Sequence, residues 1–297
     1  MSISVIIPAY NEEQGISHVL KDLRATLDSS NHDYELIVVD DASTDKTAAI
    51  AREYGVKVVQ NPANVGYGAS IIRGIMAANY ETLAITDADG TYPVQDLPRL
   101  IEYIDKGFDM AIGERTGIYF RENALKHPAR LVFKYLSEFV AGTKIPDINS
   151  GLRVFKKSTV MPFLNQMSWG FSFTTSITLI YALNGKCIKY VPIEYYPRKG
   201  KSKVRFIRDT LRTAQILTET IIIYNTLKIF ILISFVLGLL ALGALAAFIF
   251  MKDTLLLLMC FMGLASSAIV FSIGLLSILF KTKVVEKFPN TIGTKSS

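Results

Sequence analysis

Residues 82–93 read TLAITDADGTYP, a short apolar run that ends in two acids, Asp87 and Asp89. The apolar run predicts a buried strand, and the acids then lie in the loop that follows it. Ligands of a parallel sheet collect at the carboxyl ends of its strands. Two carboxylates one residue apart can share a hard cation with a substrate phosphate. We therefore expect a ligand site at this loop.

Strand-like and helix-like segments alternate on both sides of this stretch. The segments with a strand pattern are residues 4–7, 35–39, 56–59, 110–113 and 152–155. The segments with a helical pattern are residues 12–27, 47–54, 69–78, 96–104, 131–140 and 173–183. Such alternation predicts an α/β fold, with a mostly parallel sheet covered by helices on both faces.

The end of the chain has a different composition. Residues 229–251 and 255–280 are almost free of charge, and about 20 apolar residues suffice to cross a bilayer as a helix. We expect two transmembrane helices. Before them, residues 203–224 place apolar side chains at helical spacing with arginines on a neighbouring face, which predicts an amphipathic helix in the membrane interface. The alternative is an ordinary surface helix packed on the globular domain.

These segments define the expected organisation. The α/β domain takes residues 1–202, the interface helix 203–226, the two transmembrane helices 227–281 and a cytoplasmic tail 282–297. The N-terminus has no basic region before its first apolar run, so it is not a signal peptide. Small residues in the spans predict that they pack together or against another subunit, and a homo-oligomer is a further expectation; they are Gly238, Gly243, Ala247, Gly263 and Ser267.

Charge and cysteine content narrow the environment. The net charge is +6, and much of the basic excess lies between Arg198 and Arg212, just before the first span. This placement fits an anionic lipid surface better than nucleic acid. The positive-inside rule then puts the α/β domain and both termini in the cytoplasm of a multi-pass cell-membrane protein. The two cysteines, Cys187 and Cys260, lie far apart and indicate neither a disulfide framework nor a zinc site.

Two further groups of residues lie where predicted strands end or helices begin. Acids such as Glu12 and Asp40 can accept hydrogen bonds from a base or a ribose, whereas Ser43, Thr44 and Asp45 are as well explained by capping of the next helix. The segment 64–68, NVGYG, is not a P-loop, because no Gly-Lys-Ser/Thr follows. Its glycines are also consistent with a tight turn alone.

Together these motifs resemble family 2 glycosyltransferases of GT-A fold, and among them the polyprenyl-phosphate sugar synthases. The resemblance is carried by IPAYNEE at 7–13, VDDASTD at 39–45, NVGYG at 64–68, DADG at 87–90, NSGLR at 149–153 and RKGKSK at 198–203. One departure is the pair Gly90 and Thr91, where those enzymes often carry Leu-Gln, whose Gln helps to hold the metal.

The resemblance implies roles for individual residues. Mg²⁺ or Mn²⁺ would be held by Asp87 and Asp89, and the implied catalytic residues are these two and Arg115. The nucleotide sugar would be bound by Pro8, Tyr10, Glu12, Asp40, Gly66, Gly68 and Asp87. The acceptor phosphate would be bound by Arg115, Arg198, Lys201, Ser202 and Lys203.

The implied reaction is an inverting transfer of a sugar from a UDP- or GDP-sugar to undecaprenyl or dolichyl phosphate. One alternative acceptor is a diacylglycerol, a ceramide or a polysaccharide, and another alternative is an inert, membrane-tethered binding protein. An acceptor hydroxyl needs a general base, whereas an anionic phosphate needs cationic neighbours. The basic run at 198–203 therefore favours the phosphate acceptor.

Overall fold

The computed structural model describes residues 2–30, 32–117, 127–168, 170, 172–197, 215 and 226–287. The chain forms two compact units, Met1–Leu217 and Thr218–Ser297. The first is an α/β unit and the second is a pair of apolar helices. The predicted interface helix falls almost wholly outside the described residues, so it and the domain boundaries stay predictions.

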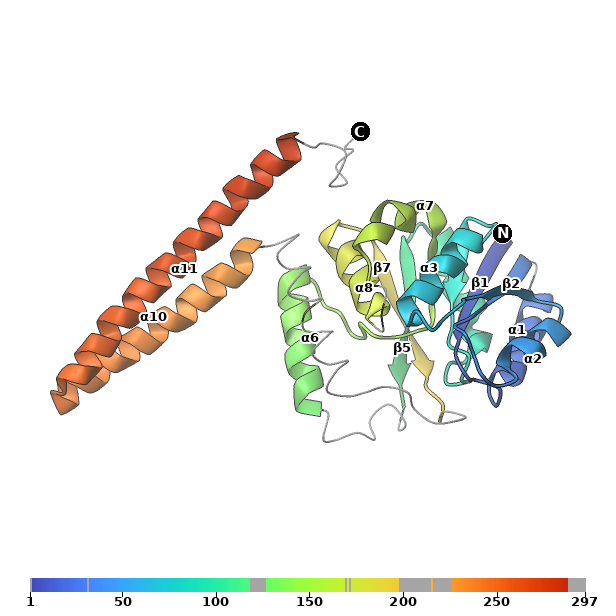
Figure 1. Ribbon diagram of the computed structural model, residues 1–297, viewed down its shortest axis with the longest axis horizontal. Helices are drawn as coiled ribbons and strands as arrows, with labels where there is room; N and C mark the ends of the chain where they lie inside the picture. The colour runs from blue at the N-terminus through green and yellow to red at the C-terminus, as the bar shows by residue number, and fades with distance from the viewer. Residues whose placement is uncertain are drawn as a thin grey trace. The chain divides into compact units, whose positions relative to one another are not determined.

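The α/β unit contains the alternating elements expected from the sequence (Figure 1). Its strands are β1 Ser2–Ala9, β2 Asp33–Asp40, β3 Lys57–Gln60, β4 Thr82–Ile85, β5 Met110–Thr116, β6 Arg153–Lys156 and β7 Ile188–Glu194. Its helices are α1 Ile16–Asp28, α2 Thr47–Glu53, α3 Tyr67–Ala77, α4 Leu97–Asp105, α6 His127–Ala141, α7 Lys157–Val160 and α8 Phe173–Leu183, with 3₁₀ turns η1 Val94–Asp96 and η3 Met161–Gln166.

The seven strands form one sheet in the order β3-β2-β1-β4-β6-β5-β7. The four strands β3, β2, β1 and β4 are parallel neighbours, and β7 is parallel to β5. Strand β6 runs antiparallel to both of its neighbours, β4 and β5. The prediction of a mostly parallel α/β sheet is confirmed, and β6 makes the sheet mixed.

Strand β7 was not predicted. Its sequence, IKYVPIE, contains Pro192, and a proline argues against a strand inside a sheet because it lacks an N–H group. The structure resolves the conflict because β7 is the last strand of the sheet, and an edge strand tolerates proline.

Helices cover both faces of the sheet, as expected. On β1, Val5 and Ile7 belong to the core cluster that contains Leu20 and Leu23 of α1. Successive side chains of a strand point to opposite faces, so Ile6 points the other way. There it meets Gly74 of α3, where an added Cβ would lie 2.4 Å from Ile6 Cγ2. The central strand is therefore buried on both sides.

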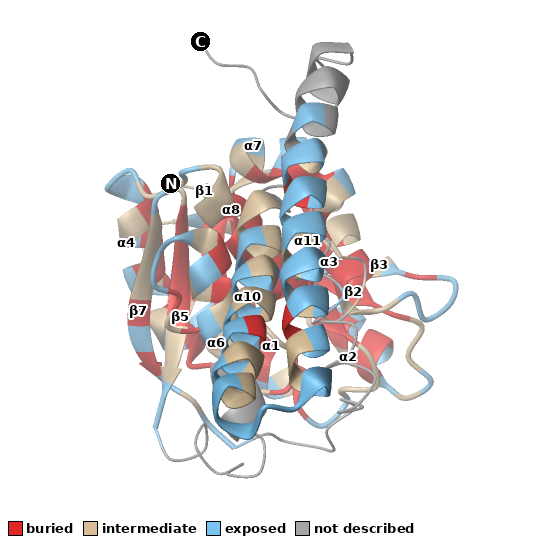
Figure 2. Cartoon of the chain, turned by 90° about the vertical axis from the view of Figure 1, so that its left-hand side faces the viewer, coloured by how far each residue is buried: buried red, intermediate tan, exposed pale blue. Residues whose placement is uncertain are grey.

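The second unit is a helical hairpin of α10 Thr226–Met251 and α11 Thr254–Lys287, joined by Lys252 and Asp253. Leu227–Met251 and Thr254–Ser277 are long and apolar enough to cross a membrane. Figure 2 shows α10 and α11 coloured mostly exposed or intermediate, and only 6% of each apolar window is buried. The expectation of two long apolar helices at the end of the chain is confirmed.

Small residues let the two helices of the hairpin approach closely. The hydroxyls of Ser234 and Ser267 lie 2.9 Å apart, and each donates to the backbone carbonyl oxygen of the other residue, at 2.9 and 2.8 Å. A Cβ on Gly263 would lie 2.9 Å from Ala241 Cβ. By contrast, no described atom lies within 4 Å of a Cβ built on Gly243. Ser267 and Gly263 therefore serve packing within the hairpin, as one of the two expected roles.

Candidate functional site

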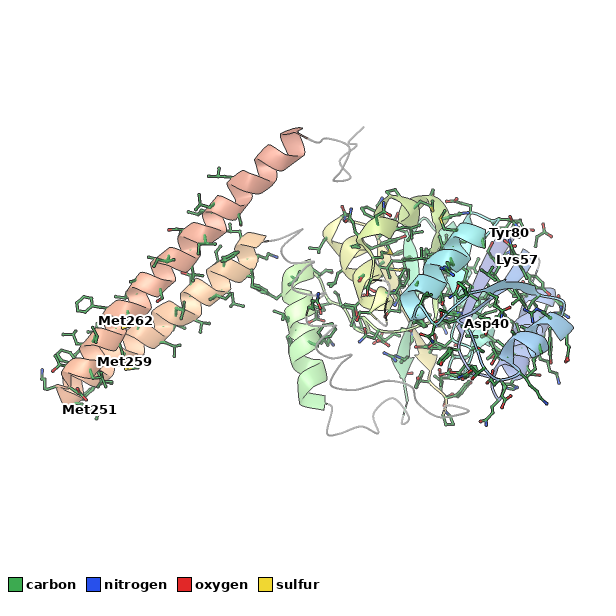
Figure 3. All side chains as sticks on the ribbon, viewed as in Figure 1. Asp40, Lys57, Tyr80, Met251, Met259 and Met262 are labelled. Atoms are coloured by element: carbon green, nitrogen blue, oxygen red, sulfur yellow. The ribbon has the colours of Figure 1, made fainter. Side chains whose placement is uncertain are left out.

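The carboxyl ends of β1, β2 and β4 lie side by side at the same end of the sheet. Ala9 at the end of β1 pairs with Asp40 at the end of β2, and Ile6 pairs with Ile85 at the end of β4. Figure 3 labels Asp40 apart from Lys57 and Tyr80, which lie at the start of β3 and just before β4. The loops that carry the predicted residues therefore lie side by side.

The loops after β1 and β2 are joined by a row of hydrogen bonds. The amide N–H groups of Asn11, Glu12 and Glu13 donate to the side chains of Ser43, Thr47 and Asp45, at 2.9, 2.8 and 3.2 Å. In return, Thr44 N–H donates to Asn11 Oδ1 at 2.7 Å. Residues 43–45 therefore have a role that neither interpretation foresaw, because their side chains hold the adjacent loop, which carries Pro8, Tyr10 and Glu12.

Asp40 and Asp41 have different environments although they are neighbours. Asp41 accepts three hydrogen bonds, from Asn61 Nδ2 at 2.7 Å and from the backbone N–H groups of Val65 and Gly66, both at 2.9 Å. Asp40 is fully buried, and its Oδ2 accepts no hydrogen bond from any described residue. A buried polar atom without a partner is costly, so Asp40 Oδ2 is a candidate acceptor for a ligand N–H or O–H group.

The glycines of the NVGYG segment open α3. Gly66 has a φ of 99°, which favours glycine, and its N–H is held by Asp41. Gly68 N–H donates to the carbonyl oxygen of Gly170 at 3.1 Å. The tight turn is therefore real, and it brings Tyr67 to the start of the helix beside the loop after β4.

The Asp87 carboxylate is enclosed by two residues that the sequence did not single out for it. Tyr67 Oη donates to Asp87 Oδ1 at 2.8 Å. On the other side lies Gly151, where an added Cβ would sit 2.9 Å from both carboxylate oxygens. Gly151 N–H donates to Tyr92 Oη at 2.7 Å. Burial and the negative charge of Asp87 raise the pKa of Tyr67 well above its usual value, so its hydroxyl stays protonated.

Asp89 is held mainly by its own loop. Its Oδ1 accepts from the N–H group and the hydroxyl of Thr91, at 3.1 and 2.7 Å. Gly90 has a φ of 73°, which glycine adopts without strain. The Gly90-Thr91 departure from the family pattern therefore forms a tight turn whose threonine orients Asp89. Behind this loop, an added Cβ on Gly15 would lie 2.5 Å from the Ala88 carbonyl oxygen.

The donor set at this loop fits a hard divalent cation. Asp87 and Asp89 offer only oxygen ligands, which suit Mg²⁺ or Mn²⁺ better than zinc or copper. Among the residues that the structure describes, no group of three or more acidic, histidine or cysteine side chains is placed to hold a metal. Such a site suits a cation that completes its coordination with substrate phosphates and water.

Arg115 lies at the end of β5, where it forms a salt bridge that was not predicted. Its Nε and Nη2 donate to the two carboxylate oxygens of Asp147, both at 2.8 Å. The side chains of Arg115 and Asp147 are 16% and 4% exposed. Burial alone would raise the pKa of Asp147, but the Arg115 charge together with hydrogen bonds from Arg115 and the Asn149 N–H group outweighs burial and lowers this pKa. The guanidinium also lies over the Tyr195 ring, 5.5 Å from its centroid.

A second arginine, Arg153, is completely buried. It donates to the carbonyl oxygens of Ser150 and Thr174 and to Thr178 Oγ1. Burial lowers its pKa. Sequence analysis used NSGLR only to recognise the family, and the structure shows that Arg153 fixes the turn that contains Gly151.

The basic run predicted to bind an acceptor comes directly after a segment, residues 195–197, that contacts this site. Tyr196 N–H donates to the carbonyl oxygen of Thr91 at 2.9 Å, and Tyr195 packs edge-on against Tyr92 with ring centroids 5.4 Å apart. Arg198, Lys201, Ser202 and Lys203 lie outside the described residues. The chain that leads into them is therefore tied to the loop of Asp89.

The sheet order and the acidic loop at its edge define a glycosyltransferase of GT-A type. Residues 4–162, more than half of the chain, match the family described as Glycosyl transferase family 2. The chain belongs to this family, and it is a glycosyltransferase.

Two relatives and one solved structure illustrate the relationship. A Haloferax volcanii protein named dolichyl-phosphate hexose transferase is 30% identical over 205 residues, which cover 68% of this chain and 86% of that protein. An Edwardsiella ictaluri protein named undecaprenyl-phosphate 4-deoxy-4-formamido-L-arabinose transferase is 33% identical over 173 residues, covering 55% of this chain and 51% of that protein. Glucosyl-3-phosphoglycerate synthase from Mycobacterium tuberculosis, solved with Mn²⁺, UDP and glucosyl-3-phosphoglycerate, shares the fold with a TM-score of 0.60 at 19% identity, over 74% of this chain and 79% of that one.

Proposed function

We propose that the protein transfers a sugar from a UDP- or GDP-sugar to a polyprenyl phosphate and releases the nucleoside diphosphate. The observation that carries the acceptor choice is the hydrogen bond from Tyr196 N–H to Thr91, next to Asp89. It ties Tyr196, two residues before the basic run 198–203, to the acidic loop, and two span-length helices follow in the same chain. The two relatives named above support a lipid phosphate as acceptor.

In this proposal the edge of the sheet binds the nucleotide. The unpartnered Asp40 Oδ2 accepts a hydrogen bond from the base or ribose, beside the loop of Pro8, Tyr10 and Glu12. The turn at Gly66 and Gly68 borders the same edge. Asp87 and Asp89 hold Mg²⁺ or Mn²⁺, which when bound supplies positive charge for the departing diphosphate.

The acceptor needs no side-chain base. The phosphate oxygen of a lipid phosphate is already anionic, so it attacks the anomeric carbon directly and the configuration inverts, giving a β-linked product from an α-linked donor. Asp147 fixes the plane of the Arg115 guanidinium, and the exposed part of that side chain contacts the phosphate together with Arg198, Lys201, Ser202 and Lys203. Arginine is suited to this role because it grips phosphate with paired hydrogen bonds.

The test is a panel of radiolabelled UDP- and GDP-sugars, each offered with undecaprenyl or dolichyl phosphate and Mn²⁺ or Mg²⁺ and scored for label extracted into organic solvent. One donor is expected to label the lipid phosphate in a β linkage. Transfer only to diacylglycerol, ceramide or polysaccharide would replace the acceptor in this proposal. Donor binding without transfer to any acceptor would indicate an inert binding protein.

The basic run is tested separately. Losing one hydrogen bond to a charged group removes about 1.5–3 kcal/mol, so Arg198→Ala should lower kcat/KM for the lipid phosphate roughly tenfold to a hundredfold. The affinity for the nucleotide sugar should hardly change. Lys106→Ala is the control, because Lys106 is exposed and pairs only locally with Glu102. If Arg198→Ala instead weakens binding of the nucleotide sugar, the proposed assignment of the basic run to the acceptor phosphate is wrong.

A further inference from the structure

The Asp87 carboxylate is enclosed from two directions by separate elements. Tyr67, the first residue of α3, donates its hydroxyl to Asp87 Oδ1 at 2.8 Å. Gly151, in the loop before β6, lies so close that an added Cβ would be 2.9 Å from both oxygens and 3.0 Å from Cγ. Real Cβ atoms do not approach other heavy atoms this closely, so a larger residue at position 151 requires the Asp87 carboxylate to move.

We propose that Tyr67 and Gly151 are positioning residues that fix the Asp87 carboxylate in one orientation for the metal and the donor diphosphate. This inference rests on the proposed role of Asp87 in the transfer reaction. It assigns a function to the NVGYG and NSGLR segments, which lie more than 80 residues apart in the sequence and both contact the Asp87 carboxylate.

Tyr67 acts through its hydroxyl group. Its oxygen lies 2.8 Å from Asp87 Oδ1, and a phenol hydroxyl facing a carboxylate is the donor of that hydrogen bond. A hydrogen bond to a charged acceptor is stronger than one between neutral groups. The bond therefore selects one rotation of the carboxylate.

Gly151 acts through the absence of a side chain. The Asp87 carboxylate occupies the space that a Cβ at position 151 would need, and Gly151 is itself held in place on both sides. Its N–H donates to Tyr92 Oη at 2.7 Å, and the preceding carbonyl, of Ser150, accepts two hydrogen bonds from the buried Arg153. Because these hydrogen bonds hold the Gly151 backbone and the atoms nearest an added Cβ are the end of the Asp87 side chain, we expect a methyl group at position 151 to turn the carboxylate away.

Two minimal variants test this inference, each with a matched control. Tyr67→Phe removes only the hydroxyl, and its control is Tyr34→Phe, which removes an exposed Tyr–Asp hydrogen bond, from Tyr34 to Asp28, near the beginning of β2. Gly151→Ala adds one methyl group, and its control is Gly74→Ala, whose Cβ would meet Ile6 in the core at 2.4 Å. The controls reproduce the chemical change without touching Asp87.

The readout is the affinity for Mn²⁺, measured on the full-length protein in detergent by the electron paramagnetic resonance signal of free Mn²⁺, alone and with UDP or GDP. We expect Tyr67→Phe to weaken Mn²⁺ binding about tenfold, as for one lost hydrogen bond to a charged group. Gly151→Ala should weaken it at least as much. Thermal unfolding of Gly151→Ala should resemble that of Gly74→Ala, whose Mn²⁺ affinity should equal that of the parent.

The results separate this inference from the proposed function. If Tyr67→Phe and Gly151→Ala bind Mn²⁺ as tightly as their controls, or if the parent protein binds no Mn²⁺ with either nucleotide, the positioning role is wrong. If the parent transfers no sugar to any lipid phosphate, the proposed function fails, but the comparison of Mn²⁺ affinities still decides whether Tyr67 and Gly151 position Asp87.

Discussion

At the scale of single residues, the adjacent acids Asp40 and Asp41 differ in their hydrogen-bond partners. Residue Asp41 accepts hydrogen bonds from three protein donors and thereby holds the turn before α3. Asp40 is buried, and its Oδ2 accepts from no described group. Asp41 is bound to the protein, whereas Asp40 is the one that we propose accepts a hydrogen bond from the donor nucleotide.

Substitutions should separate these two roles. Asp41→Ala leaves three donors without an acceptor, so it should lower the free energy of unfolding by ~2–4 kcal/mol. Asp40→Asn removes a buried charge, so stability should not fall, while the affinity for the donor nucleotide should. Chemical denaturation and nucleotide titration measure the two effects. If Asp40→Asn destabilises the protein and binds the nucleotide with parental affinity, Asp40 has a structural role and the proposed role in donor binding is wrong.

Asp89 gives the sharpest test of the metal. Since its carboxylate is proposed as a principal ligand, Asp89→Asn should abolish transfer while the protein stays folded, and EDTA should do the same to the parent. Asp96→Asn is a suitable control, because Asp96 pairs with Arg99 on the surface. Full activity in EDTA would show that the metal assignment is wrong.

The sequence located the acids but not the residues that hold them. Asp40, Asp87 and Asp89 follow apolar runs, so a strand pattern and the rule for strand ends suffice to find them. The contacts of Gly15 and Gly151 depend on backbones that approach only in three dimensions, and no local pattern records such a gap. The pairing of Arg115 with Asp147 likewise joins residues 32 positions apart.

At the scale of elements, the strands that were predicted correctly are those with local signals. Each of β1, β2 and β4 contains an apolar run, at residues 5–7, 36–39 and 83–85. The direction of β6 has no local signal, because a short apolar run reads the same in a parallel or an antiparallel ladder. β7 was missed because Pro192 is acceptable only at an edge, and the edge is a property of the whole sheet.

The salt bridge between Arg115 and Asp147 joins β5 to the loop before β6. Removing one partner of a buried pair leaves an uncompensated charge, so Arg115→Ala should lower the free energy of unfolding by about 3–5 kcal/mol. This loss, seen by denaturant titration, must be subtracted before any effect of Arg115 on acceptor binding is judged. An Arg115→Ala protein of parental stability would contradict the bridge.

The same bridge predicts a dependence on pH. The folded-state pKa of Asp147 is lowered, so the bridge contributes stability above the unfolded value of about 3.9 and loses it as the pH falls through the lower folded value. The stability difference between the parent and Asp147→Asn should therefore be largest near neutral pH and shrink below pH ~4. A stability difference that grows as the pH falls would show that the folded-state pKa of Asp147 is not lowered.

At the scale of the whole molecule, two span-length helices joined by only Lys252 and Asp253 can cross a bilayer only as a hairpin. The α/β unit and the C-terminal tail must then share one side, which we propose is the cytoplasm. Cysteines introduced at Thr254 and Ser296, in a protein without Cys187 and Cys260, report the two sides. Thr254→Cys should react with an impermeant maleimide in intact cells, and Ser296→Cys only after permeabilisation. The opposite pattern would invert the topology.

The antiparallel strand β6 also sets the order in which the site can form. Residues 82–85 of β4 must pair with residues 153–156 of β6, whereas β1, β2, β3 and β4 pair among residues 2–85. Contacts between distant parts of a chain form slowly, and a chain made from its N-terminus can pair its early strands first. Strands β1 to β4, whose ends carry the proposed nucleotide site, can therefore pair before the ribosome has synthesised Gly151. The loop of Asp87 and Asp89 reaches its final geometry only after residues 151–156 have been synthesised and have folded onto β4.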